Sequence, residues 1–191
     1  MKTGASERLS GFTLAEVAVV VLLMALIISV GAGVLIYNNR FYETQSGEIF
    51  SVNATREAAD RINEYGRQAT DVESAYTYSS ISYLTGSQTV IFRVPSLDIN
   101  NAIIPSSYDY VIIGANPNDA SRLELIVNPA AGSSRPARNL LLSDKLTTVN
   151  FVYDNSDLAL ARRVDYTIHV TDAGRSPGQE QISGSVTLRN K

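Results

Sequence analysis

A single apolar run near the N-terminus constrains this chain more than any other feature of its sequence. The 26 residues Phe12–Tyr37 contain only one Asp, Glu, Lys, Arg or His, which is Glu16. As an α-helix rising 1.5 Å per residue, the run would be about 39 Å long, more than the ~30 Å hydrocarbon core of a bilayer. Helices in soluble cores are rarely apolar on every side over such a length. The run therefore predicts a membrane-spanning helix.

The flanks of the run indicate its topology. Lys2 and Arg8 outnumber Glu7 before the run, and this weakly positive flank favours a cytoplasmic N-terminus. A secretory signal has an apolar run of about 7–15 residues followed by a small-residue cleavage site, and this segment has neither property. We therefore expect a retained, single-pass helix in the cytoplasmic membrane, with the C-terminal part of the chain outside.

The pattern of the remaining sequence predicts more helix and then strands. Residues 38–72 carry an apolar stripe at helical spacing, and from about residue 75 the hydrophobic period changes to two. The expected fold class is α+β, with one long helix whose C-terminal half covers one face of an antiparallel β-sheet. The stripe consists of Ile49, Val52, Ala59, Ile62, Ala69 and Val72. Strands are expected at 76–83, 89–94, 108–114, 122–127, 149–153, 164–170 and 182–189, with a hairpin loop at 172–179.

Composition narrows the chemistry that the chain can perform. Its 16 Lys and Arg against 19 Asp and Glu give a net charge of −3, which disfavours a general nucleic-acid binder, and Arg135 and Arg138 are expected to be solvated. The absence of cysteine excludes disulfides and thiolate chemistry, and one histidine, His169, excludes a His-rich metal site. No nucleotide-binding, hydrolase or zinc-protease motif is present, so we expect neither enzymatic activity nor a cofactor.

One oxygen-rich loop is a candidate for Ca²⁺. It contains Asp154, Asn155 and Asp157, but the spacing is not that of an EF-hand and no bidentate Glu follows at the required place. An Asx turn, in which such side chains accept backbone N–H groups, is the simpler interpretation.

The residues at the start of the apolar run resemble the N-terminus of type IV pilins and pseudopilins. A short charged leader ends at Gly11, Phe12 follows, and Glu16 would be the fifth residue of the mature chain. The resemblance covers about residues 2–37. It implies cleavage by prepilin peptidase between Gly11 and Phe12, N-methylation of Phe12, and a lollipop-shaped fold. The implied domains are a leader (1–11), a transmembrane and filament-core helix (12–37), an amphipathic helix (38–72) and an antiparallel β head (73–191).

The resemblance also implies a role in assembly for Glu16. Cleavage exposes the α-amine of Phe12, whose reference pKa of about 7.7–8.0 keeps it positive, and methylation preserves the charge. Glu16 would pair with this amine in its own chain or in a neighbouring subunit, which fixes register more than it adds stability. A small-residue series provides a candidate helix-packing face. Its members are Ala25, Ser29 and Gly33. Major pilins often carry proline at the Gly33 position, so a minor pilin or pseudopilin fits better.

The function implied is a structural subunit of a type IV pilus or of a type II secretion pseudopilus. Its partners would be other pilin or pseudopilin subunits, prepilin peptidase, the inner-membrane assembly platform and the membrane, with no nucleic acid expected. The subunit would leave the cytoplasmic membrane for a periplasmic or cell-surface filament. The alternative from another class is a membrane-anchored extracytoplasmic binding domain or enzyme unrelated to filaments, which predicts no processing. A DNA-uptake pilin is a third possibility and would need a basic surface strip.

Overall fold

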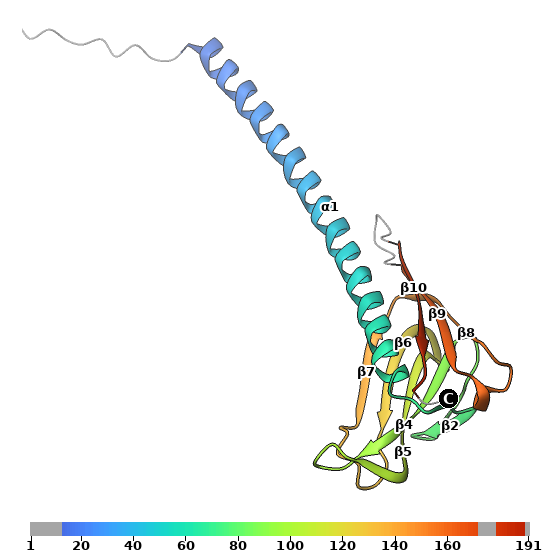
Figure 1. The fold of residues 1–191 in the computed structure, drawn as a ribbon. Coiled ribbons are helices and arrows are strands. Elements are labelled where there is room, and N and C mark those ends of the chain that lie inside the picture. The colour runs from blue at the N-terminus through green and yellow to red at the C-terminus, as the bar shows by residue number, and fades with distance from the viewer. Residues whose placement is uncertain (1–12, 172–178, 190–191) are drawn as a thin grey trace, which may run out of the picture. The chain divides into compact units, whose positions relative to one another are not determined.

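The computed structural model describes residues 13–171 and 179–189. The chain divides into two compact units, Met1–Glu43 and Thr44–Lys191. One long helix, α1 (Leu14–Gly66), begins in the first unit and ends in the second (Figure 1). The described part of the chain thus confirms the predicted long helix and the α+β class.

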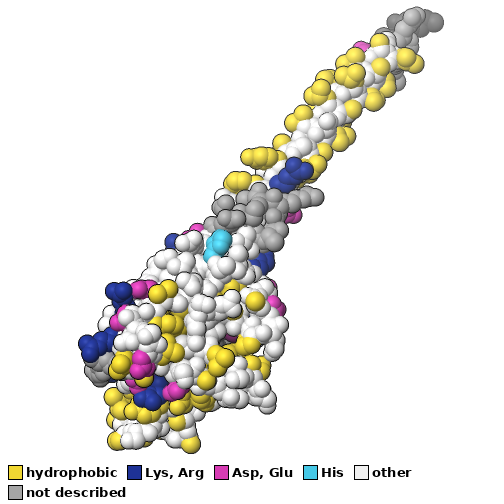
Figure 2. All heavy atoms as spheres, turned by 90° about the vertical axis from the view of Figure 1, so that its right-hand side faces the viewer, with side chains coloured by type: hydrophobic (Ala, Val, Ile, Leu, Met, Phe, Trp, Pro, Cys, Tyr) yellow, Lys and Arg dark blue, Asp and Glu magenta, His cyan; other side chains and the backbone are white. Residues whose placement is uncertain are grey.

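In the first unit, α1 exposes its apolar side chains. Every described side chain from residue 13 to residue 43 is exposed. The segment Leu14–Glu43 is long and apolar enough to cross a membrane. Hydrophobic side chains cover the visible side of this part of the helix (Figure 2).

The second unit contains three antiparallel sheets (Figure 1). The five strands of the largest sheet, in spatial order, are β1 (Asp71–Val72), β4 (Thr89–Leu97), β5 (Ile103–Asn116), β6 (Asp119–Asn128) and β7 (Arg138–Ser143). A second sheet has the order β10 (Gln179–Thr187), β9 (Arg163–Thr171) and β8 (Leu146–Tyr153). The third is the hairpin of β2 (Ala75–Tyr78) and β3 (Ile81–Leu84). A short 3₁₀-helix, η1 (Leu158–Leu160), lies between β8 and β9.

Two hydrophobic clusters lie on opposite faces of the five-stranded sheet. The larger joins the last turns of α1 to this sheet and to the three-stranded sheet, and includes the fully buried Ile62, Phe92 and Ile168. The smaller contains Ile91 and Ile112 and packs beneath the β2–β3 hairpin. The expectation of a single sheet with one covered face is therefore wrong. Both faces are covered, which explains why β4 and β5 contain unbroken apolar runs and not a strict alternation.

The helix ends earlier than predicted. It stops at Gly66, and residues 71 and 72, which were assigned to helix, form strand β1 beside β4. A Cβ on Gly66 would lie 2.7 Å from both methyl groups of Val186 in β10, so the helix end approaches this strand too closely for a side chain. Ile49, which the stripe places in the core, is 60% exposed.

Strand predictions fail in two further places. The predicted strand 76–83 is the β2–β3 hairpin, because Ser79 and Ser80 both have positive φ (48° and 70°), as in a type I′ turn. Strand β7 (Arg138–Ser143) was not predicted, because its three consecutive leucines hide any alternation. The predicted loop 172–179 is one residue too long, because Gln179 is the first residue of β10. Residues 172–178 and 1–12 lie outside the described residues.

Candidate functional site

The start of α1 is built around Thr13 and Glu16. The Thr13 backbone N–H and hydroxyl both donate to Glu16 Oε2, at 2.8 and 3.0 Å, and the Glu16 N–H donates to the Thr13 hydroxyl oxygen at 3.3 Å. This reciprocal arrangement is a capping box, in which the side chains of the first helical turn satisfy N–H groups that the helix leaves unpaired. The Thr-x-x-Glu spacing in the sequence is the signal for this cap, which adds to the assembly role predicted for Glu16.

The capping box gives the Glu16 carboxylate a local role and a fixed direction. Both bonds from Thr13 go to Oε2, and Oε1 accepts no hydrogen bond from residues 13–171 or 179–189. Capping requires an acceptor oxygen, whereas pairing with an amine requires a negative charge. The two roles are compatible, because each can use a different oxygen, and they can be separated by substitution.

The small residues proposed as a packing face lie along the exposed part of α1. Ala25, Ser29 and Gly33 are one helical turn apart and all are exposed. A Cβ built on Gly31 or Gly33 meets no atom within 4 Å, so this surface has room for close approach by another helix. The cleavage and methylation residues, Gly11 and Phe12, lie outside the described residues.

The candidate calcium loop uses its oxygens for backbone hydrogen bonds. Asn155 Oδ1 accepts the Asp157 N–H at 2.9 Å, and Asp157 Oδ1 accepts the Ala159 N–H at 3.1 Å and caps η1. These are the Asx turns that the sequence predicts. Asp154 Oδ1 accepts the Arg162 N–H at 2.9 Å. This bond and a backbone hydrogen bond from Arg163 lower the pKa of Asp154. Residues 13–171 and 179–189 contain no group of three His, Asp or Glu that could hold a metal ion.

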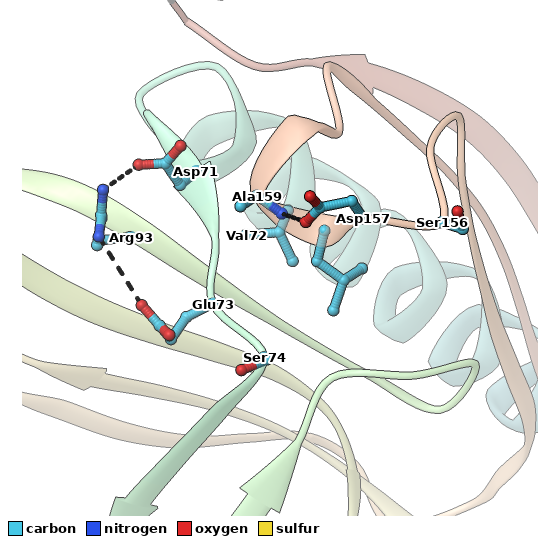
Figure 3. Close-up of a pocket in the computed structure, with 9 residues that line it drawn as sticks. Asp71, Val72, Glu73, Ser74, Arg93, Ser156, Asp157 and Ala159 are labelled. Carbon is cyan, nitrogen blue, oxygen red and sulfur yellow. Dashed lines mark hydrogen bonds and ion pairs between the residues drawn. The ribbon is translucent and has the colours of Figure 1, made fainter.

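A pocket of about 420 Å³ lies between β1, β4 and η1 (Figure 3). Its central cation is Arg93, which forms an ion pair with Asp71 and lies 3.9 Å from a Glu73 carboxylate oxygen. The guanidinium also stacks over the Tyr108 ring, 4.5 Å from its centroid. Asp157 also lines this pocket, and its Oδ1 accepts a hydrogen bond from the Ala159 N–H. Arg93 thus shares this pocket with the carboxylates of Asp71, Glu73 and Asp157, so the residues that line it carry a net negative charge.

A buried ion pair that the sequence analysis missed joins the loop before β7 to β5. Asp109 is fully buried, and Arg135 donates from Nε to its Oδ2 at 2.9 Å. Burial by itself raises the pKa of Asp109, but hydrogen bonds outweigh it and the pKa is lowered. The other donors are Ser96 Oγ (2.7 Å), the Ala130 N–H (2.9 Å) and Ser133 Oγ (2.9 Å). The expectation that Arg135 is solvated is wrong, because its side chain is only 11% exposed.

The predicted site residues belong to two different units of the chain. Glu16 and the small-residue series belong to α1 in the first unit, whereas the acidic loop belongs to the second. The functional feature with the most distinctive geometry is therefore the exposed apolar helix with its self-capped start. No family model matches the chain, and no curated protein or solved structure matches it either.

Proposed function

We propose that the chain is a structural subunit, a minor pilin or pseudopilin, of a type IV pilus or a type II secretion pseudopilus. Prepilin peptidase cuts between Gly11 and Phe12 and methylates the new Phe12 amine. The mature subunit is anchored in the cytoplasmic membrane by α1 and then enters a filament through the same helix.

The proposal rests on the position of the cleavage motif, which lies directly before the first residue of α1. Only Phe12 and Thr13 separate the cleaved bond from Leu14, the first residue of α1. Glu16 lies in the first turn, with its carboxylate drawn toward the helix start by Thr13. The new amine and the acid that pairs with it would therefore both lie at the same end of an apolar helix.

The exposed surface of the first unit supports the same conclusion. All described side chains up to residue 43 are exposed, and most of them are hydrophobic. An apolar surface of this extent requires a bilayer or other apolar helices around it. A subunit stored in a membrane and later packed in a filament core meets this requirement in both states, because neighbouring helices replace the lipid.

Mass spectrometry of the full chain, expressed with and without an active prepilin peptidase, tests the proposal. With the peptidase, we expect a chain that begins at Phe12 and carries one added methyl group. Without it, the chain should keep residues 1–11. A Gly11→Ile variant is the matched control. A bulky side chain before the cut bond should keep the backbone at this bond away from the active site of the peptidase and leave the leader attached.

An unprocessed chain would contradict the proposal. If the chain keeps Met1 in the presence of a peptidase that processes a known substrate in the same cells, the pilin proposal is wrong. The membrane-anchored binding domain would then be the better description.

A further inference from the structure

The C-terminal end of the apolar run carries residues suited to a membrane surface. Tyr37, Phe41 and Tyr42 are 69%, 48% and 68% exposed on α1. The rings of Phe41 and Tyr42 meet edge to face, with centroids 6.5 Å apart. Arg40 is the first Lys, Arg, Asp or Glu after Glu16. The aliphatic surface thus ends in a band of aromatic and charged side chains.

These aromatic residues lie within a short stretch of the helix and on more than one of its faces. Tyr37 and Phe41 are one turn apart on the same face, whereas Tyr42 points about 100° away from Phe41. All three lie within about 7.5 Å along the helix axis. A seam between two helices would place its rings along one face, whereas a membrane interface collects tyrosine around the helix at the headgroup level.

The distance between the two ends of the aliphatic segment matches a bilayer. Tyr37 follows Glu16 by 21 positions, which corresponds to about 32 Å of α-helix. The hydrocarbon core is ~30 Å thick. When the Tyr37 ring lies at one boundary of the hydrocarbon, the Glu16 carboxylate therefore lies at the opposite boundary.

We propose that Tyr37, Phe41 and Tyr42 form an interfacial belt that binds the phospholipid headgroup region and holds α1 at one depth in the membrane. The proposal rests on the membrane-spanning part of the proposed function and is independent of processing. At this depth, Glu16 lies among headgroups and water at the opposite surface. A carboxylate at the bilayer centre is costly, so the belt also keeps the acid in its charged form while the subunit is stored in the membrane.

Cysteine labelling tests the belt directly, because the full chain contains no native cysteine. Val34→Cys and Glu43→Cys variants of the full chain would be inserted into phosphatidylethanolamine–phosphatidylglycerol vesicles, with the C-terminal unit outside. A membrane-impermeant maleimide should label Glu43→Cys at least tenfold faster than Val34→Cys. Adding Tyr37→Ala and Phe41→Ala to each variant should reduce this contrast below threefold, because the helix can then slide along the membrane normal.

Ile36→Ala is the matched control, since Ile36 is 56% exposed, apolar and adjacent to the belt. This substitution should keep the tenfold contrast. The proposal is overturned if the belt substitutions leave the contrast unchanged, or if the contrast depends on the protein-to-lipid ratio, which would show that other copies of the helix cover these rings. If the N-terminus is unprocessed but the tenfold difference in labelling is observed, the proposed processing is wrong and the interfacial belt is still supported.

Discussion

At the scale of single residues, Glu16 combines an observed helix cap with a proposed charge pair. Its Oε2 caps the helix through Thr13, and its charge is the proposed partner of the Phe12 amine. A capping box works with either Glu or Gln, because only an acceptor oxygen is needed. The charge pair works only with an acid.

Glu16→Gln therefore separates the two roles. We expect the variant to keep the helix start and to be cleaved like the wild type, but to enter filaments at least tenfold less efficiently. Glu16→Val should lose both roles, with a cap loss of about 1 kcal/mol in helix stability. Cleavage would be followed by mass spectrometry, and incorporation by quantifying the subunit in sheared filaments.

The interpretation of this pair of variants is direct. If the Gln variant assembled as well as the wild type while the Val variant failed, the helix cap would explain Glu16 and the charge pair would be wrong. Thr13→Val provides a further comparison, because it removes only the hydroxyl and leaves the carboxylate charge intact.

At the scale of elements, the end of α1 packs closely against β10. A Cβ on Gly66 would lie 2.7 Å from both Val186 methyl groups. Val186 is 2% exposed, so it has little room to move. The helix end was placed too late because residues 71 and 72 pair with β4, a strand far along the sequence that local patterning does not reveal.

Gly66→Ala tests this contact. We expect the variant to destabilise the second unit by about 1–3 kcal/mol, as overpacked cores do, even though alanine is the better helix former. Adding Val186→Ala should make the double variant about as stable as Val186→Ala alone, because the new methyl group fills part of the space. Gly86→Ala, where nothing lies within 4 Å, is the control. Chemical denaturation curves of the wild type and the four variants give the comparison, and additive losses would contradict the contact.

Alternating burial is the clearest local signal among the strands that the sequence predicts. The strands at 149–153 and 164–170 alternate between buried and exposed positions, and the structure confirms them within β8 and β9. The β2–β3 turn was missed because two serines replace the usual Asn-Gly signal. The Asp109–Arg135 pair was missed because the two residues are 26 positions apart in sequence, and only the folded sheet brings them together.

At the scale of the whole second unit, Asp109 connects several parts of the fold. It receives hydrogen bonds from β4 and from the loop that precedes β7, while Arg135 also donates to Gln68, just after α1, at 3.1 Å. Removing the charge of Asp109 would leave the Arg135 guanidinium buried without its partner. Such a change typically costs 3–5 kcal/mol.

Asp109→Asn should therefore destabilise the unit by about 3–5 kcal/mol near neutral pH. Because the folded-state pKa of Asp109 is lowered, its contribution is full above the unfolded-state pKa of ~3.9 and disappears as the pH falls through the lower folded-state value. The stability difference between wild type and variant should accordingly shrink as the pH is lowered from 5 toward 2. Denaturation midpoints across this range measure it.

Asp144→Asn is the control for this experiment, since Asp144 is exposed and the substitution changes the net charge equally. It should alter stability by less than about 0.5 kcal/mol. A difference that stays constant across the acidic range for Asp109→Asn would show that its carboxylate charge does not contribute to folding.

The self-capped start of α1 has a consequence for maturation. Every group of the capping box belongs to Thr13 or Glu16, downstream of the bond that the peptidase would cut. Removing the leader takes away none of these groups, so the helix need not unwind before the protease acts or reform afterwards. Under the proposed processing, the precursor and the mature chain would therefore share the same capped helix start, and cleavage would change only the charge next to it.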